Sequence, residues 1–395
     1  MNLLAWRPEF PILETCTYLV SHSLGAMPAR ARRYLTQFAD EWDRRGVRAW
    51  HEGWWDVGRE TGNLLAPVIG APKDTITMHQ NATVAQSIVA SCFEYSGTRR
   101  KIVLQDLDFP TNHYLFEGFR RYGAEIVIVP SDDSIRARID RLVDAIDERT
   151  VLVPISLVLF RSACVQDVRP VVEKAHRVGA RVILDAYQGA GAVPLDVTAL
   201  GVDFAVGGSV KWLCGGPGAG YLYVRPDLIT SLRPSVVGWA GHTEPFGFET
   251  GAIRYADRIE RFQSGTPNVP ALYSARAGYE IVAEIGVPAI RARSLHLTLR
   301  IIDAALAQGW RLNTPTAENE RGGSVVIDVP GGQHVCDELI RRQVIVDYRP
   351  GAGVRMAPHF YNTEDEVDRA MATMEEIVQT SKFEVRTTNS GTHSR

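Results

Sequence analysis

The stretch "RVILDAYQGAGAVPLDVTALGVDFAVGGSVKWLCGGPGAGYLYV", residues 181–224, contains three short apolar runs separated by polar and glycine-rich segments. The runs "RVILDA", "DFAVGG" and "GYLYV" are nearly continuous in apolar residues, which is typical of strands buried on both faces beneath helices. Asp185 ends the first run, and Lys211 follows the second among glycines and small or apolar neighbours. Because ligands bind beyond the carboxyl ends of parallel strands, we expect these two side chains to share a site.

The same pattern extends over the preceding part of the chain. Four further runs, "TITMH", "KIVLQD", "EIVIVP" and "TVLVPIS", alternate with helical patterns such as the one at residues 134–149. This alternation predicts a large α/β domain with a mainly parallel sheet at residues 55–272.

The pattern changes after the large domain. A long helical segment and the runs "SVVIDVP", "VIVDYRP" and "GVRMAPH" predict a smaller α+β domain at residues 273–380, which the N-terminal arm at residues 1–54 joins. A last helix is expected to begin near Thr363, which has capping-box spacing to Glu366. The polar residues 381–395 are expected to be disordered.

Composition narrows the class of protein. With 395 residues, of which 45% are apolar and 23% charged, and a net charge of −3, the chain gives no indication of a nucleic-acid or membrane partner. No apolar run could span a bilayer, and the N-terminus lacks the features of a secretory signal, so we expect a cytoplasmic protein. The five cysteines are scattered and the histidines form no ligand pair, so we expect neither disulfides nor a metal site.

A third feature is expected at the edge that carries Asp185 and Lys211. In "TMHQNATVAQSIVAS", residues 77–91, a predicted strand runs into a helix whose first turn holds Asn81, Ala82 and Thr83. Free N–H groups and the positive end of the helix dipole make such a turn an anion site that suits a phosphate. Each feature alone has an ordinary interpretation as a turn, a loop or a helix cap.

Together, the three features indicate pyridoxal 5'-phosphate (PLP). The amine of Lys211 would form a Schiff base with the aldehyde, and Asp185 would keep the pyridine nitrogen protonated so that the ring accepts electrons. Poor solvation would also lower the pKa of the lysine and make the free amine available.

The sequence around the lysine resembles a known family. Residues 184–228 resemble the lysine region of fold-type I PLP enzymes in the aminotransferase class V group, and within that group the chain most resembles the kynureninases. Similar segments are "YLVSHSLGAMP" (18–28), "DFPTNHY" (108–114), "VVGWAGHTEPFGFE" (236–249), "RFQSGTP" (261–267) and "VIVDYRPGAGVRMAPHFYN" (344–362). The resemblance implies the fold-type I architecture, with a mainly parallel seven-stranded sheet in the large domain and a smaller α+β C-terminal domain.

The resemblance also implies roles for individual residues. Lys211 and Asp185 would be catalytic, and Arg355 would grip the α-carboxylate of an amino acid substrate. Residues implied to contact the cofactor are Ala82, Thr83, Phe109, Asn112, Ser156, Asp185, Gln188, Lys211, Trp239 and Thr266. Trp239 and Thr266 match positions that reach the phosphate from a neighbouring subunit, which implies a homodimer with shared sites. Trp50 and His51 are expected to line the substrate entrance, although this tryptophan-rich segment could equally dock the N-terminal arm.

Three positions depart from the kynureninase pattern. This chain has Asn112 where an aspartate is usual, Gln188 where a histidine is expected, and Val210 where a tyrosine precedes the lysine. Valine can neither bond a phosphate nor transfer a proton, so the resemblance leaves kynurenine hydrolysis open.

The prediction is therefore a PLP enzyme that acts on an amino acid through an external aldimine. Cleavage at Cβ is preferred, either C–C hydrolysis as in kynureninase or β-elimination of an S-substituted cysteine. Transamination or decarboxylating deamination is the alternative. Cysteine desulfuration, which needs a mobile nucleophilic cysteine, and a catalytically retired PLP-binding protein are less favoured. The sequence does not identify the substrate.

Overall fold

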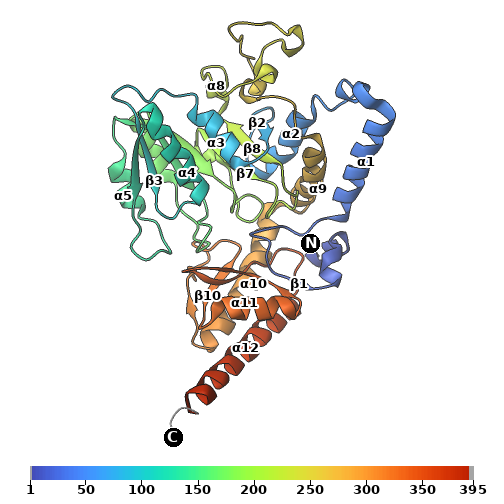
Figure 1. Cartoon of the computed structure of the whole chain (residues 1–395), viewed down its shortest axis with the longest axis vertical. Helices are drawn as coiled ribbons and strands as arrows, with labels where there is room; N and C mark the ends of the chain where they lie inside the picture. The colour runs from blue at the N-terminus through green and yellow to red at the C-terminus, as the bar shows by residue number, and fades with distance from the viewer. Residues whose placement is uncertain (1, 391–395) are drawn as a thin grey trace.

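The computed structural model describes residues 2–390, with side chains to residue 380, as a large α/β part and a smaller α+β part (Figure 1). The large part is built on a seven-stranded sheet. In spatial order its strands are β2 (Ile76–His79), β8 (Gly220–Val224), β7 (Phe204–Gly208), β6 (Arg181–Asp185), β5 (Thr150–Ser156), β3 (Lys101–Gln105) and β4 (Glu125–Val129). β8 runs opposite to the other six strands, which all point the same way, so the predicted fold class, with its mainly parallel sheet, is confirmed.

Helices cover both faces of this sheet, which explains why its strands are continuously apolar. On β3, Ile102 and Leu104 pack into one core with helices α3 and α4, whereas Val103 packs into the core on the other face. The α-helices of residues 2–390, of which α10, α11 and α12 pack into the core of the smaller part, are α1 (Ala29–Arg45), α2 (Val57–Ile69), α3 (Ala82–Ala90), α4 (Pro110–Gly118), α5 (Ile139–Ala145), α6 (Arg169–Arg177), α7 (Val197–Leu200), α8 (Pro226–Ile229), α9 (Val269–Ile285), α10 (Val287–Ala307), α11 (Gly332–Arg341) and α12 (Glu364–Ser390). Within residues 2–390, every helix is too short or too polar to cross a bilayer.

The helix expected over residues 134–149 is shorter in the structure. It is confined to α5, because the preceding residues form a turn in which Asp133 Oδ1 accepts hydrogen bonds from the N–H groups of Ile135 and Arg136, both at 2.8 Å. Ser134 has a φ of 58°, which interrupts any helix through this turn.

The smaller part has a sheet and a core of its own. Its sheet has the order β12 (Asp347–Arg349), β13 (Gly353–Met356), β10 (Val325–Asp328) and β9 (Arg311–Leu312). The N-terminal segment joins it, since β1 (Thr17–Tyr18) pairs in parallel with β11 (Val344–Ile345) and Leu19 enters its core. The domain boundaries themselves stay predictions.

The last helix begins as the sequence predicts. The N–H of Thr363 donates to Glu366 Oε2 at 2.8 Å, and the N–H of Glu366 donates to Thr363 Oγ1 at 3.2 Å, which is a capping box. The helix α12 continues to Ser390 through part of the segment predicted to be disordered, and residues 391–395 of that segment lie outside the described residues.

Strand register brings the predicted site together. Ser156 is paired with Asp185 across β5 and β6, and His79 and Gly208 are both paired with Gly220. The carboxyl ends of β2, β5, β6 and β7 therefore meet at one edge of the sheet, from which the chain enters α3 and the Lys211 loop.

Candidate active site

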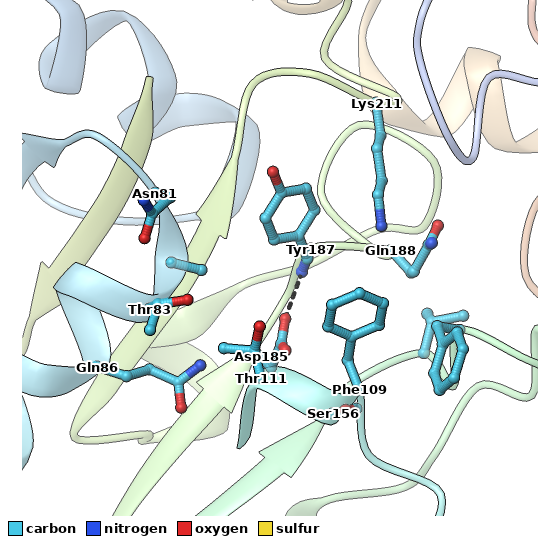
Figure 2. A pocket seen from close by; sticks show the side chains of 13 residues that line it. Asn81, Thr83, Gln86, Phe109, Thr111, Ser156, Asp185, Tyr187, Gln188 and Lys211 are labelled. Atoms are coloured by element: carbon cyan, nitrogen blue, oxygen red, sulfur yellow. Dashed lines mark hydrogen bonds between the residues drawn. The ribbon is translucent and has the colours of Figure 1, made fainter. Parts of the chain in front are cut away.

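A cavity of about 220 Å³ opens at this edge of the sheet (Figure 2). It lies between the start of α3, the segment before α4, the ends of β5 and β6 and the loop after β7. The lining residues are Asn81, Ala82, Thr83, Gln86, Phe109, Thr111, Ser156, Val158, Phe160, Asp185, Tyr187, Gln188 and Lys211. Seven of the predicted site residues, Ala82, Thr83, Phe109, Ser156, Asp185, Gln188 and Lys211, are thus brought to one cavity.

The amine of Lys211 projects into this cavity without a polar partner. Its Nζ lies 4.4 Å from the ring centroid of Tyr187 and 5.7 Å from that of Phe109. Among the described side chains, no carboxylate or other acceptor lies within hydrogen-bonding distance of this nitrogen. Burial lowers the pKa of Lys211 to about 8, although Asp185 acts in the opposite direction. At pH 7 the free-amine fraction is therefore about 300-fold larger than for an ordinary lysine.

Asp185 is a buried carboxylate at the end of β6. Its Oδ1 accepts a hydrogen bond from the backbone N–H of Tyr187 at 3.0 Å. Burial raises the pKa of Asp185, and the N–H of Tyr187, the charge of Lys211 and the amide of Asn112 oppose that rise. Gln86 Nε2 donates to Asn112 Oδ1 at 2.9 Å, which leaves the amide nitrogen of Asn112 to face Asp185. The predicted residue Asn112 therefore acts on Asp185 from behind the cavity wall.

The start of α3 forms one end of the cavity. Asn81 is the N-cap, and its Oδ1 accepts a hydrogen bond from the N–H of Val84 at 3.0 Å. The N–H groups of Ala82 and Thr83, in the first turn, have no intrahelical acceptor. A Cβ at Gly220 would lie 2.7 Å from the backbone of Asn81, so glycine permits β8 to pack directly against this turn. The result is a helix N-terminus that opens into the cavity and can bind a phosphate.

Two other predicted residues, Phe109 and Ser156, form part of the cavity wall. The ring of Phe109 is 44% exposed and packs edge-on against Phe160 at 5.1 Å, so one of its faces is open to the cavity. Ser156 Oγ donates to Asp108 Oδ1 at 2.7 Å. Burial raises the pKa of Asp108 to about 6, against the opposing effect of hydrogen bonds from Gln105 and Ser156.

Gln188 connects segments that are distant in sequence. Its Oε1 accepts a hydrogen bond from Trp212 Nε1 at 2.9 Å, and its Nε2 donates to the carbonyl of His22 at 3.0 Å. Gln188 thereby joins the Lys211 loop to the N-terminal segment.

Arg355 lies just behind the cavity, on β13. It is 2% exposed, and its Nε and Nη2 donate to the two carboxylate oxygens of Asp347 at 2.7 and 2.6 Å. Its Nη1 donates to the carbonyl of Phe160 at 2.7 Å, and Phe160 lines the cavity.

The remaining predicted residues lie elsewhere in this chain. Trp239 is 40% exposed and packs on Trp55 at 5.0 Å, and the ring of His51 lies 5.8 Å from that of Phe246. The residues Trp50 and Thr266 lie in two other pockets: Trp50 packs edge-on against Trp54 and Trp55, and Thr266 lies with Gln263 and Asn268. The role of Trp239 and Thr266 at a neighbouring subunit's cavity stays a prediction, as does the role of Trp50 and His51 at the substrate entrance.

Sequence reasoning missed Tyr187 as a wall of the cavity. The signal was its position just after Asp185, beyond the carboxyl end of a predicted parallel strand, where ligands bind. Gly208 makes room for this ring, since a Cβ there would lie 2.4 Å from Tyr187 Oη. Gln86, Thr111, Val158 and Phe160 were also missed, and they carry no comparable sequence signal.

Residues 26–370 match the sequence profile of the family described as aminotransferase class-V. The chain belongs to this family. The kynureninases of Bacillus anthracis and Pseudomonas fluorescens are each 30% identical to it, over 96% and 98% of this chain and 92% and 96% of their own. An uncharacterized aminotransferase of Bacillus subtilis is 31% identical over 93% of this chain and 95% of its own.

Solved structures of lower identity share the fold. A cysteine desulfurase from Thermococcus onnurineus NA1 has a TM-score of 0.84 at 20% identity, covering 95% of this chain and 98% of its own. A cystine C–S lyase in complex with its product, cysteine persulfide, has a TM-score of 0.82 at 20% identity, covering 92% and 98%. Both confirm the fold-type I architecture of this class V chain.

PLP is the cofactor of this family, and the cavity fits it. The amine of Lys211 has no polar partner, and Asp185 is a buried carboxylate that forms no ion pair among residues 2–380. The open turn of α3 suits an anion, and the open face of Phe109 suits a planar ring. PLP has a group to match each of these features: its aldehyde matches the amine, its protonated ring nitrogen the carboxylate, its phosphate the turn of α3, and its aromatic ring the face of Phe109.

Proposed function

We propose that this class V enzyme cleaves a bond to Cβ of an amino acid. The reaction is either C–C hydrolysis, as in the kynureninases that it resembles, or β-elimination of an S-substituted cysteine. The observation that carries the proposal is the Lys211 amine, free of polar partners and with its pKa lowered to about 8, in a cavity that also holds a buried carboxylate.

The residues that line the cavity can be assigned to the parts of PLP that they would bind. We assign the phosphate to the N–H groups of Ala82 and Thr83, and the proton on the ring nitrogen to a pairing with Asp185. Phe109 would pack against the ring, and Ser156 and Gln188 complete the wall of the cavity. PLP, when bound, supplies an electron sink for the bonds of the substrate Cα. Lys211 Nζ takes the proton from Cα and returns it, which requires the unprotonated amine that burial favours.

Arg355 binds the α-carboxylate of the substrate in this proposal. Asp347 occupies the side of the guanidinium formed by Nε and Nη2. The end formed by Nη1 and Nη2 keeps one N–H on each nitrogen for a carboxylate, because Nη1 uses its other N–H for Phe160. A bidentate contact of this kind fixes which Cα bond reacts.

Transamination or decarboxylating deamination is the second candidate, since the 31% identical relative is described as an aminotransferase. Cysteine desulfuration is disfavoured because none of the five cysteines lines the cavity and burial raises the pKa of each thiol. A retired protein is disfavoured because Lys211, Asp185 and Arg355 are retained.

We further propose a homodimer in which Trp239 and Thr266 reach the phosphate in the partner's cavity. The support is the exposed aromatic surface formed by Trp239, Phe246 and Phe248, which are 40%, 48% and 71% exposed. A cytoplasmic location stays a prediction.

One screen tests the reaction. Purified protein loaded with PLP is incubated with kynurenines, S-alkyl cysteine conjugates and common amino acids, and mass spectrometry scores anthranilate, pyruvate, keto acids and ammonia. Anthranilate from a kynurenine, or pyruvate with ammonia and the free thiol from an S-alkyl cysteine, supports cleavage at Cβ if it disappears in Lys211→Ala, whereas a keto acid with retained side chain supports transamination. Borohydride treatment that leaves Lys211 unlabelled would refute the mechanism.

A further inference from the structure

We infer that His22 is a positioning residue for the substrate carboxylate: it holds Asp347, and Asp347 holds the guanidinium of Arg355. The inference rests on the proposed role of Arg355 and assigns a function to the N-terminal segment, which does not line the cavity.

The geometry is a continuous chain of hydrogen bonds. His22 Nε2 lies 3.0 Å from Asp347 Oδ1. The same oxygen accepts Arg355 Nε at 2.7 Å, and Asp347 Oδ2 accepts Arg355 Nη2 at 2.6 Å. His22 therefore fixes the rotation of the carboxylate, and the carboxylate fixes the plane of the guanidinium.

The protonation states of His22 and Asp347 determine which of the two donates the hydrogen bond between them. Burial lowers the pKa of His22 to about 4, and the nearby charges of Arg355 and Lys211 add to that effect, so the imidazole is neutral. Burial alone would raise the pKa of Asp347, but hydrogen bonds from His22 and Arg355 hold it well below its usual range. Because the ionised carboxylate can only accept, the shared proton belongs to His22 Nε2.

The cluster has room for one more negative charge. Asp347 is shared by two cations, since Arg349 Nη2 also lies 3.1 Å from its Oδ2. With His22 neutral, two guanidinium groups face one carboxylate, so the cluster carries one net positive charge, and its buried cation is Arg355. A substrate carboxylate at the free end of that guanidinium neutralises the surplus.

The N-terminal segment also fixes Arg355 relative to Lys211. The carbonyl of His22 accepts Gln188 Nε2 at 3.0 Å, and Gln188 holds Trp212, which is next to Lys211. The N–H of Gly25 donates to the carbonyl of Val210 at 2.8 Å. A Cβ at Gly25 would lie 2.2 Å from the Lys211 carbonyl, so this contact requires glycine. One short segment thus contacts both the loop that carries Lys211 and the hydrogen-bond chain that ends at Arg355.

The test separates the carboxylate from the amine. PLP-loaded protein is titrated with L-alanine and with L-alaninamide, which lacks the carboxylate, and the change in visible absorbance gives the apparent Kd of each. His22→Leu is expected to raise the Kd for L-alanine about tenfold, as for a lost hydrogen bond to a charged group, and to leave that for L-alaninamide unchanged. His22→Gln, whose amide nitrogen can replace Nε2, is expected to restore the wild-type ratio.

Asp347→Asn keeps the shape of the side chain and removes its charge. This variant is also expected to raise the Kd for L-alanine and to leave the Kd for L-alaninamide unchanged. The matched control is His176→Leu, because His176 Nε2 makes a similar contact of 2.9 Å with Asp203 outside the cavity. Equal shifts for both probes, or none, in His22→Leu and Asp347→Asn would overturn the inference.

A second measurement does not depend on substrate binding. Modification of Arg355 by phenylglyoxal, quantified by peptide mass spectrometry, is expected to be several-fold faster in His22→Leu than in wild type and His22→Gln. If wild-type protein loads PLP but its absorbance responds to neither L-alanine nor L-alaninamide, the proposed amino acid chemistry fails. The rate of Arg355 modification then decides the positioning role of His22 by itself. Equal rates in wild type, His22→Leu and His22→Gln would overturn that role.

Discussion

Replacing Lys211 with methionine is expected to stabilise the cofactor-free protein by about 3 kcal/mol at pH 7. The pKa of the amine falls from its ordinary value of 10.5 to about 8 in the fold, mainly because burial disfavours the ammonium ion. This difference measures the free energy that the buried charge costs the folded state. This free-energy cost already includes the attraction between Lys211 and Asp185, because that attraction raises the same pKa.

The stabilisation by Lys211→Met should decrease as the pH rises, because the pKa of Lys211 is lowered in the fold. Below about pH 8 the lysine is protonated in both the folded and unfolded states, so the full cost is present. As the pH rises from about 8 to 10.5, the unfolded state loses its proton as well and the cost disappears. Methionine has a similar length and no charge, so Lys211→Met removes the cost at every pH.

The assay is thermal unfolding of PLP-free protein at a fixed concentration. For a chain of 395 residues, 3 kcal/mol corresponds to a rise in Tm of about 4 °C at pH 7, and the rise should vanish near pH 10.5. Lys101→Met is the matched control: the amine of Lys101 donates to the carbonyl of Ala145 at 2.6 Å and pairs with Asp147 at 2.8 Å, so its loss should lower the Tm. A Tm for Lys211→Met that is unchanged, lower or independent of pH would refute the reasoning.

Three further predictions concern the same cavity. Asp185→Asn should move the midpoint for acylation of the Lys211 amine in the cofactor-free protein below about pH 8, since Asp185 raises that pKa; trace labelling with acetic anhydride across pH measures it. Gly208→Ala should weaken PLP binding about tenfold in equilibrium dialysis, because the added Cβ would push the Tyr187 ring into the cavity; unchanged affinity would show that the ring does not border the cofactor. Mixing inactive Lys211→Ala and Trp239→Ala proteins should restore up to about a quarter of wild-type activity, since half of the dimers then carry one intact shared site; no recovery would contradict the sharing.

The sequence was sufficient for the parts of the fold that depend on local pattern and chain direction. Continuous apolar runs identified the strands, because each strand contacts cores on both sides. The position of Asp185 at a strand end and of Lys211 after the next strand was enough to place both in one cavity, since parallel strands end at the same edge. The helix over residues 134–149 was overestimated because Asp133 offers the backbone a competing turn.

Contacts between distant segments could not be predicted in this way. His22 and Asp347 are 325 positions apart, and nothing near either residue indicates their hydrogen bond. Arg355 was predicted to bind a substrate carboxylate, and its bidentate contact with Asp347 and its contact with Phe160 became visible only in three dimensions. Asp108, a buried carboxylate that holds Ser156, gave no signal because an aspartate before a helix is most often a cap.

Two of the departures from the kynureninase pattern replace a titratable side chain with a neutral amide. These amides are Asn112, which accepts a hydrogen bond from Gln86 and lowers the pKa of Asp185, and Gln188, which connects Trp212 to His22. An aspartate at position 112 would place a like charge beside Asp185 and raise its pKa, whereas the amide favours the ionised form that a protonated ring nitrogen requires. The cavity therefore keeps its means of holding PLP while it loses titratable groups around it. In the proposed reaction, the choice among cleavage, elimination and transamination then depends on the substrate side chain and on the amine of Lys211, to which the proposal assigns proton transfer at Cα.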